Sequence, residues 1–235
     1  MMSRQFSEDI SDAGKQYLAT LADTTTEVSD YANALYKLGR ELGNVLCHKI
    51  GHPDENICVA CTVEDADFLA KGVIESLNAR YFQVSLACFW NQRQQLPCAQ
   101  QSLSIAPIIR KYREPDVDNA RILVIVKSVI SGACVVKTNL TYLIQEMNPE
   151  VIFVVSPVIH SQAIGKLERE FPKAISEKFQ YVYFAEDSEK LEDGNLVPGI
   201  GGSVYQRLGF KDQADKNRFT PDLVRTRREQ LVSEV

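Results

Sequence analysis

The sequence contains no apolar run close to the roughly 20 residues that a bilayer-spanning helix requires. Its first residues, MMSRQFSEDISDAG, also lack the apolar core of a signal peptide, so we expect a cytoplasmic protein with no membrane partner. Positive charge is not in excess, because 26 Lys and Arg stand against 31 Asp and Glu for a net charge of −5. No overall positive field would draw such a chain onto nucleic acid, so a small molecule is the expected partner.

Cysteine is also scarce, with six residues in a chain of 235, too few for a disulfide scaffold. Cys58 and Cys61 form a C-x-x-C pattern, but the run NICVACT is typical of a buried strand, in which residues three apart face opposite sides. We therefore expect no metal site there, and reduced thiols that mostly serve packing. The six are Cys47, Cys58, Cys61, Cys88, Cys98 and Cys134.

Apolar, β-branched runs alternate with amphipathic stretches after residue 52, which predicts β-α-β units. Continuous apolar runs such as ILVIV and VIFVV are typical of a parallel sheet covered on both faces. The predicted fold class is therefore α/β, a mainly parallel sheet flanked by helices. Strands are expected at 57–62, 81–88, 122–126, 151–156 and 181–185, and helices at 65–78, 133–147 and 161–171.

The chain divides into three parts by pattern. Residues 1–52 are expected to form a helical N-terminal extension, residues 53–212 the core, and residues 213–235 a C-terminal helical tail. The segment 89–118, rich in Gln, Pro and charge, is expected to cover the sheet edge as a flap or hairpin.

Ligands of open parallel sheets lie beyond the carboxyl ends of the strands, which directs attention to the loop after ILVIV. There Ser131, Gly132, Ala133 and Cys134 lead into a helix, an arrangement typical of a phosphate cradle with free N–H groups and a hydroxyl donor. Lys127 and Ser128, just after the strand, extend this candidate phosphate site. A simple strand-to-helix turn explains the same residues without a ligand.

Acidic residues follow the first core strand, where Thr62-Val63-Glu64-Asp65 fits a capping box that needs no chemistry. The alternative gives Glu64, Asp65 or Asp67 the role of a general base or a metal ligand. Lys127 either neutralises a ligand phosphate or forms an ion pair with these acids. His160, just past the next strand, is either an acid–base catalyst or a solvated histidine.

A glycine-rich turn, Val197-Pro198-Gly199-Ile200-Gly201-Gly202, is the other prominent motif. Three glycines in four positions after a proline expose bare backbone that is able to hydrogen-bond a planar ring. The longer run EDSEKLEDGNLVPGIGGSVYQRLGF resembles the carboxyl-terminal signature of uracil phosphoribosyltransferases, in which V-P-G-L-G occupies the place of Val197–Gly201. The order of strands and loops from about Tyr31 to Phe210 is similar as well.

The resemblance implies a type I phosphoribosyltransferase fold, usually a homodimer, in which uracil reacts with 5-phosphoribosyl-1-pyrophosphate (PRPP) and magnesium to give UMP and pyrophosphate. It also implies that main-chain atoms of 197–201 hold uracil and that residues 131–134 hold the 5′-phosphate. Three positions depart from the family: Arg-Ala-Gly becomes Glu64-Asp65-Ala66, the ribose-binding acid becomes Val126 or Lys127, and the Asp after the glycine turn becomes Gly202.

At about 4 Å and an effective dielectric near 20, each carboxylate–phosphate pair at the first of these positions would cost several kcal/mol. The sequence therefore predicts a uracil phosphoribosyltransferase-like protein that binds a pyrimidine base or nucleotide and has diverged from ordinary PRPP-dependent transfer. Two alternatives remain open. One is an active uracil phosphoribosyltransferase, and the other is an altered hydrolase or transferase acting on the glycosidic bond through Glu64, Asp65 or His160.

Overall fold

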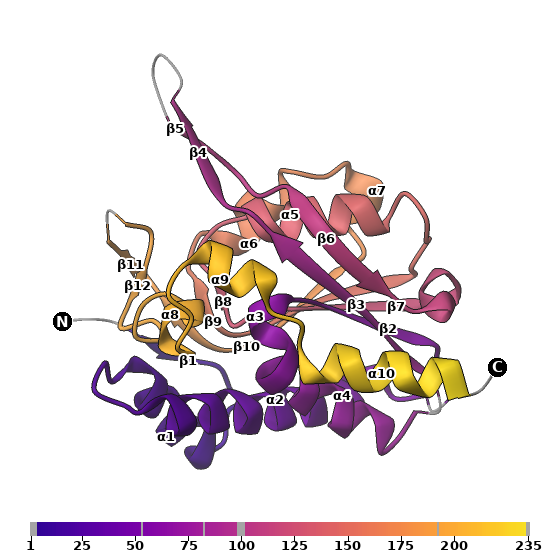
Figure 1. The fold of residues 1–235 in the computed structure, drawn as a ribbon, viewed down its shortest axis with the longest axis horizontal. Helices are drawn as coiled ribbons and strands as arrows, with labels where there is room; N and C mark the ends of the chain where they lie inside the picture. The colour runs from indigo at the N-terminus through magenta and orange to yellow at the C-terminus, as the bar shows by residue number, and fades with distance from the viewer. Residues whose placement is uncertain (1–3, 53, 82, 98–101, 192, 234–235) are drawn as a thin grey trace.

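The computed structural model describes residues 4–52, 54–81, 83–97, 102–191 and 193–233. A central sheet lies between two layers of helices, with α1, α2, α4 and α10 on one face and α5, α6 and α7 on the other (Figure 1). The strands are β1 (Gln5–Phe6), β2 (Ile57–Thr62), β3 (Val84–Asn91), β4 (Gln94–Pro97), β5 (Ser102–Ile105), β6 (Ile108–Arg113), β7 (Ile122–Val126), β8 (Val129–Ile130), β9 (Val151–His160), β10 (Phe179–Asp187), β11 (Glu189–Lys190) and β12 (Leu196–Val197). This arrangement confirms the predicted α/β fold with a mainly parallel sheet flanked by helices.

The helices differ in length and type. The α-helices are α1 (Asp12–Ala22), α2 (Val28–Ile50), α3 (Val63–Asp65), α4 (Lys71–Asn78), α5 (Cys134–Leu143), α6 (Ala163–Glu168), α7 (Lys173–Ser176), α8 (Val204–Arg207), α9 (Gln213–Arg218) and α10 (Asp222–Ser233). A π-helical turn, η1 (Ala66–Ala70), joins α3 to α4, and a 3₁₀ turn, η2 (Pro115–Asn119), precedes β7. The helix predicted over 65–78 is therefore interrupted next to the sheet edge.

The main sheet has the order β1-β10-β9-β7-β2-β3-β6, in which β10, β9, β7, β2 and β3 are parallel and the two outermost strands are antiparallel. The chain passes from β2 to β3 on one side and then returns to β7 on the other side of β2. The carboxyl ends of β2 and β7 therefore form a topological switch point, the place where open α/β sheets bind ligands.

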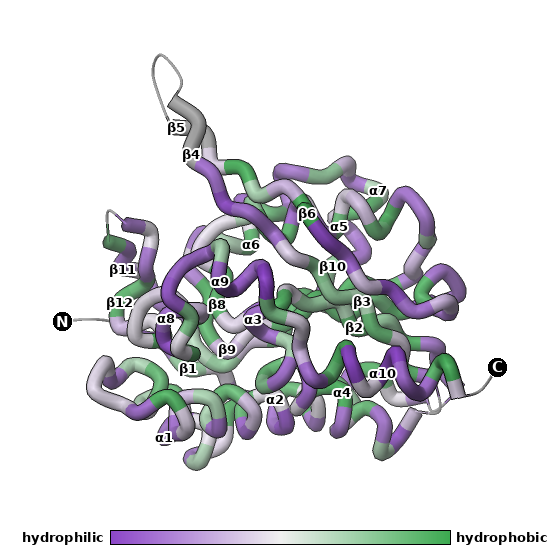
Figure 2. Tube along the Cα trace, viewed as in Figure 1, coloured by the Kyte–Doolittle hydropathy of each residue, from purple (hydrophilic) through white to green (hydrophobic). Residues whose placement is uncertain are grey.

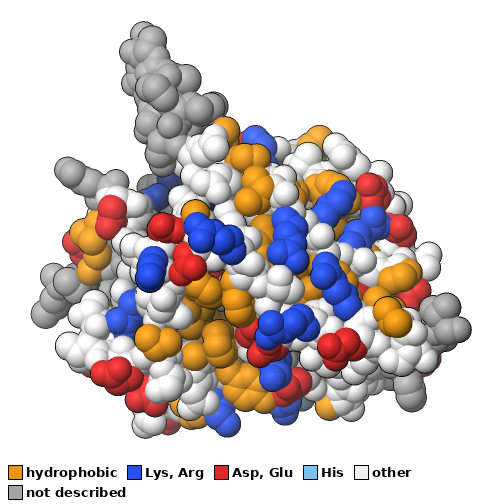
Figure 3. Space-filling model, in the orientation of Figure 1, with side chains coloured by type: hydrophobic (Ala, Val, Ile, Leu, Met, Phe, Trp, Pro, Cys, Tyr) orange, Lys and Arg blue, Asp and Glu red, His pale blue; other side chains and the backbone are white. Residues whose placement is uncertain are grey.

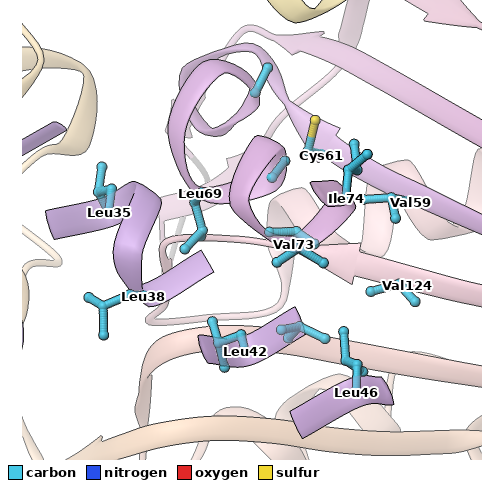
Figure 4. Close-up of a cluster of buried hydrophobic side chains, with 14 of the residues drawn as sticks. Leu35, Leu38, Leu42, Leu46, Val59, Cys61, Leu69, Val73, Ile74 and Val124 are labelled. Atoms are coloured by element: carbon cyan, nitrogen blue, oxygen red, sulfur yellow. The ribbon is translucent and has the colours of Figure 1, made fainter. Parts of the chain in front are cut away.

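The core is divided by the sheet into two apolar layers. Leucines of α2 at helical spacing (Leu35, Leu38, Leu42 and Leu46) pack toward η1, α4 and one face of the sheet (Figure 4). The central strands β2 and β7 are hydrophobic along their length, as a sheet covered on both faces requires, whereas the edge strand β6 is largely hydrophilic (Figure 2). Cys61 belongs to this layer and Cys58 to the opposite one, as the strand period predicts.

The segment 89–118, expected to cover the sheet edge as a flap or hairpin, forms a hairpin and also adds to two strands of the main sheet. Its beginning extends β3 to Asn91, its middle forms the projecting β4–β5 hairpin (Figure 1), and β6 then joins the main sheet as an antiparallel edge strand. The five cysteines in the described part of the chain are free, and Cys98 lies outside it. Among the described residues, no helix is both long and apolar enough to cross a membrane.

Candidate functional site

A cavity of about 480 Å³ opens at the carboxyl ends of the parallel strands. Residues from six separate parts of the chain line it, beginning with Glu64 after β2 and Lys127 after β7. Further lining residues are Arg93, Ser104, Ser131, Gly132, Ala133, Cys134, Lys190, Ile200, Gly202, Val204, Tyr205 and Lys216. The structure thus brings the 131–134 loop and part of the glycine-rich turn to one cavity.

The floor of the cavity contains a buried group of opposite charges. The Nζ atom of Lys127 lies 2.6 Å from Oδ2 of Asp65 and 3.2 Å from Oε1 of Glu64. The second carboxylate oxygen of Glu64 lies 3.5 Å from Nζ of Lys216, which arrives from α9 and also donates to the carbonyl oxygen of Asn91 at 3.1 Å. Two ammonium groups therefore face two carboxylates, and the floor is close to neutral.

Of the two roles that the sequence leaves open for Lys127, the structure shows the ion pair with Glu64 and Asp65, and it adds Lys216, which the sequence does not indicate. Burial alone would raise the pKa of Glu64, but the ammonium groups of Lys127 and Lys216 outweigh it and hold that pKa well below its usual value. Burial tends to lower the pKa of Lys127, but Asp65 and Glu64 raise it overall. Lys127 is thus the cation of an ion pair at the base of the cavity.

The capping box is not formed either. The hydroxyl of Thr62 donates to Oδ2 of Asp65 at 2.6 Å, and no side chain accepts a hydrogen bond as a cap of α3. The other oxygen of Asp65 accepts the backbone N–H of Ser128 at 3.2 Å. Both oxygens of this fully buried carboxylate therefore accept hydrogen bonds from inside the protein, and Asp65 is not among the residues that line the cavity.

Two other predicted site residues lie away from the cavity wall. His160 is buried at the end of β9, where its Nδ1 accepts the backbone N–H of Gln162 at 3.1 Å. Burial, followed by the positive charges of Lys166 and Lys190, lowers the pKa of His160. Ser128 is fully buried, and its hydroxyl has no hydrogen-bond partner among the described residues.

The Arg4–Asp187 ion pair binds the main chain of the glycine-rich turn at Gly199. Arg4 donates to both carboxylate oxygens of the buried Asp187, at 2.8 and 2.7 Å, and to the carbonyl oxygen of Gly199 at 2.6 Å. The N–H of Gly199 donates to the same carboxylate at 2.9 Å. The main chain of Gly199 is therefore occupied, which excludes it from the predicted contact with a pyrimidine ring.

Only part of the predicted ring-binding turn reaches the cavity. Ile200 and Gly202 line it, whereas Val197, Pro198, Gly199 and Gly201 do not. The carbonyl oxygen of Ile200 already accepts the hydroxyl of Tyr31 at 2.9 Å. The backbone of Gly202 and the side chains of Ile200, Val204 and Tyr205 thus form this wall.

The 131–134 loop and the first turn of α5 form another wall, where α5 has no acidic residue and no side-chain cap. As in every α-helix, the first N–H groups of α5 have no partner within the helix, and no side chain caps them here. Lys190 donates to the carbonyl oxygen of Ser131 at 3.3 Å, and Arg93 lines the same cavity. The sequence patterns did not single out Arg93, Lys190 or Lys216, because each belongs to a charged surface-like stretch whose partners are distant in sequence.

The described residues do not form a metal site made of protein side chains alone. They contain no group of three or more His, Cys, Asp or Glu side chains that could ligate a metal. Of the two carboxylates that line the cavity, Glu64 and Asp193, Glu64 faces Lys127 and Lys216, whose positive charges oppose a further cation.

The AQ2163 protein from Aquifex aeolicus has the same fold, with a TM-score of 0.67 and 15% identity over 85% of this chain and 96% of that one. A Neisseria gonorrhoeae protein solved with bound ppGpp has a TM-score of 0.40 and 11% identity, covering 65% of this chain and 82% of that one. A hypoxanthine phosphoribosyltransferase from Staphylococcus aureus has a TM-score of 0.42 and 8% identity, covering 65% and 74% respectively. No family model matches the chain, and no curated protein matches it.

Proposed function

We propose that the protein binds a 5′-phosphorylated pyrimidine nucleotide, UMP or a close relative, and has diverged from ordinary PRPP-dependent transfer. The observation that carries this proposal is the composition of the cavity at the β2/β7 switch point. Its lining includes four basic side chains and two acidic ones, together with the N-terminus of α5 and an apolar wall. A phosphate and a planar ring each find a suitable surface in one cavity.

The phosphate is assigned to the 131–134 loop. Free N–H groups at the start of α5 and the positive end of the helix dipole favour a dianion there. Arg93 and Lys190 supply further positive charge from two other walls. Gly132 leaves room for the close approach, because a Cβ atom added there would meet no atom within 4 Å.

The ring is assigned to the wall formed by Ile200, Gly202 and Tyr205. The preference for uracil rests on the resemblance of the glycine-rich turn to the uracil phosphoribosyltransferase signature. Homodimeric assembly and a cytoplasmic location remain predictions on the same footing as the preference for uracil.

Divergence from PRPP chemistry is supported by the floor of the cavity. A pyrophosphate at the 64–66 loop would meet Lys127 and Lys216 only where each is already paired with a carboxylate. The loop therefore offers a phosphate no net positive charge. The position after β7 has diverged as well. In the family that the sequence resembles an acid there holds the ribose hydroxyls, whereas in this chain Lys127 follows the strand directly.

One observation favours an altered enzyme as the second candidate. Oε2 of Glu64 is buried at the cavity and has no hydrogen-bond partner among the described residues. Because its pKa is held low, Glu64 is ionised at neutral pH and is suited to accept a hydrogen bond from a ribose hydroxyl or a water molecule. Such a carboxylate is a weak base, so we rank hydrolysis below binding.

A thermal-shift panel tests the proposal, using uracil, cytosine, UMP, CMP, GMP and PRPP, each with and without magnesium. At 100 times its dissociation constant a ligand stabilises the fold by about 2.7 kcal/mol, which at roughly 2–4 °C per kcal/mol is readily measured in a chain of this size. We expect a shift with UMP and none with PRPP. A shift with PRPP and magnesium alone, accompanied by release of pyrophosphate when uracil is added, would reject the proposal.

A variant pair locates the phosphate. Gly132→Asp introduces a carboxylate into the loop without a steric clash and should abolish the UMP shift. Asn44→Asp adds the same charge at an exposed position on α2 outside the cavity lining and should leave the shift unchanged. Retention of the UMP shift in Gly132→Asp would place the phosphate elsewhere.

A further inference from the structure

A second cavity, of about 470 Å³, adjoins the first. The two share Ser104, Ala133 and Cys134 among their lining residues, so they meet at the N-terminus of α5. The remaining lining residues of the second cavity are Ile105, Lys137, Thr138, Lys166, Arg169 and Glu170. Nothing in the proposed binding of a nucleoside monophosphate uses this space.

The charge of the two cavities is opposite to that of the whole protein. Together their linings contain seven basic and three acidic side chains, a surplus of four positive charges, in a chain whose net charge is −5. In the second cavity, Lys137 forms an ion pair with Glu170. Lys166 and Arg169 supply the surplus there.

Several other basic side chains of the protein have partners in the structure, those of β6 and α10 among them. Those on β6 and α10, which are prominent in Figure 3, pair with carboxylates or stack on aromatic rings, as Arg227 does with Glu114 and Arg110 with Trp90. In contrast, Arg93, Lys190, Lys166 and Arg169 form no salt bridge with any residue that the structure describes. Four basic side chains without a salt bridge among the described residues therefore line the two cavities.

The cations of the two cavities also act on one another. Burial is the main cause of the lowered pKa of Lys190, and the positive charges of Lys166 and Arg93 lower it further. Lys166 lines the second cavity, whereas Lys190 and Arg93 line the first. Positive charges of the two cavities therefore lie close enough to act on one another across the N-terminus of α5. A single phosphate in the first cavity would leave the charges of Lys166 and Arg169 uncompensated.

We propose that the second cavity binds a second phosphate group of the same ligand, with Lys166 and Arg169 as its contacts. This inference rests on the proposed function, which places the first phosphate at the 131–134 loop. The ligand class is a nucleoside that carries phosphates on two separate arms. A nucleoside 3′,5′-bisphosphate and a 5′-phosphorylated dinucleotide both have this chemistry.

Isothermal titration calorimetry at 150 mM salt tests the assignment with UMP, uridine 3′,5′-bisphosphate and the dinucleotide pUpU. The proteins are the wild type, the double variant Lys166→Gln/Arg169→Gln, and the control Lys173→Gln, which removes an exposed charge from α7 outside both cavities. At this salt concentration the Debye length is about 8 Å, so distant charges contribute little.

We expect the wild type to bind the bisphosphate at least about tenfold more tightly than UMP, the effect of one charge-assisted hydrogen bond. The double variant should lose this advantage and keep its affinity for UMP within about threefold, and Lys173→Gln should behave as the wild type. Equal affinity of the wild type for UMP and for both two-phosphate ligands would overturn the inference and leave the proposed function standing. An advantage that survives in the double variant would also overturn it.

The two probes distinguish the source of the second phosphate. If pUpU retains the advantage, the ligand is of the dinucleotide kind, whereas an advantage confined to the bisphosphate assigns a mononucleotide. Failure of UMP, bisphosphate and pUpU alike to bind would reject the proposed function itself.

Discussion

Replacement of Lys127 by Met is the most direct test of the charge balance in the cavity floor. The side chain of Lys127 is 5% exposed, and those of its partners Asp65 and Glu64 are 0% and 9% exposed. Methionine has a similar length and no charge, so Lys127→Met leaves two carboxylates buried together with only Lys216 nearby. Breaking a buried ion pair from one side costs about 3–5 kcal/mol.

The pH dependence of this loss follows from the carboxylates. In the wild type the low pKa of Glu64 contributes stability above the unfolded value of about 4.3, and this contribution is lost as the pH falls through the folded value. In Lys127→Met the folded pKa of Glu64 rises, because one of the two ammonium groups that compensate its burial is lost. The deficit should therefore be full at pH 7.5 and smaller at pH 5, where the variant begins to take up protons.

Urea denaturation at the two pH values measures both effects. Adding Asp65→Asn to Lys127→Met removes the carboxylate that has lost its ion-pair partner and should recover about 2 kcal/mol of the loss, a coupling within the range for residues in contact. Lys173→Met, which breaks an exposed pair with Glu177, should change stability by less than about 0.5 kcal/mol. A loss below about 1 kcal/mol in Lys127→Met, or one independent of pH, would refute the reasoning.

Three further predictions follow from single positions. Gly201→Ala should lower the free energy of unfolding, measured in urea, by about 1–3 kcal/mol, because φ is 71° and the new Cβ atom would lie 2.4 Å from the carbonyl oxygen of Leu21. The control Gly132→Ala, whose Cβ atom would meet nothing within 4 Å, should cost less than about 0.5 kcal/mol. The imidazole of His160 should titrate below pH 6.5 by NMR, and Lys166→Gln should raise its midpoint by removing a repelling charge; an unchanged midpoint would show that Lys166 is too far away. Asp67→Ala should cost about 1 kcal/mol and speed amide exchange at the start of α10, because the Asp67 carboxylate accepts the first two N–H groups of that helix, and unchanged exchange would contradict this role.

The fold was predictable because its strongest signals are local. The strand bounds 57–62 and 122–126 match β2 and β7, since a short apolar run between polar residues has one clear beginning and end. The strand expected at 81–88 lies three residues later, at Val84–Asn91, because Trp90 and Asn91 continue into the pairing with β6. That pairing depends on a partner some 20 residues away in the sequence, which the local pattern does not contain.

The location of the cavity was predictable for a similar reason. The rule that ligands lie at the carboxyl ends of parallel strands selects the loops after β2 and β7, and Glu64, Lys127 and the 131–134 loop all line the cavity. The glycine-rich turn was only partly predictable. Its sequence shows that bare backbone is available, but not that Asp187 and Arg4 occupy the main chain of Gly199.

The sign of the charge at the cavity floor depends on residues that are distant in sequence. Glu64 and Lys216 are 152 positions apart, and Lys216 occurs in a charged stretch typical of an exposed helix, yet it is 3% exposed and faces the carboxylate. Its arrival makes the floor neutral and leaves the surplus positive charge at the wall that contains Arg93 and Lys190. The surplus positive charge at that wall supports the proposed phosphate site at the N-terminus of α5, away from the loop after β2. The proposed site thereby accounts for a chain whose first loop carries two acids and whose cavity still offers positive charge to an anion.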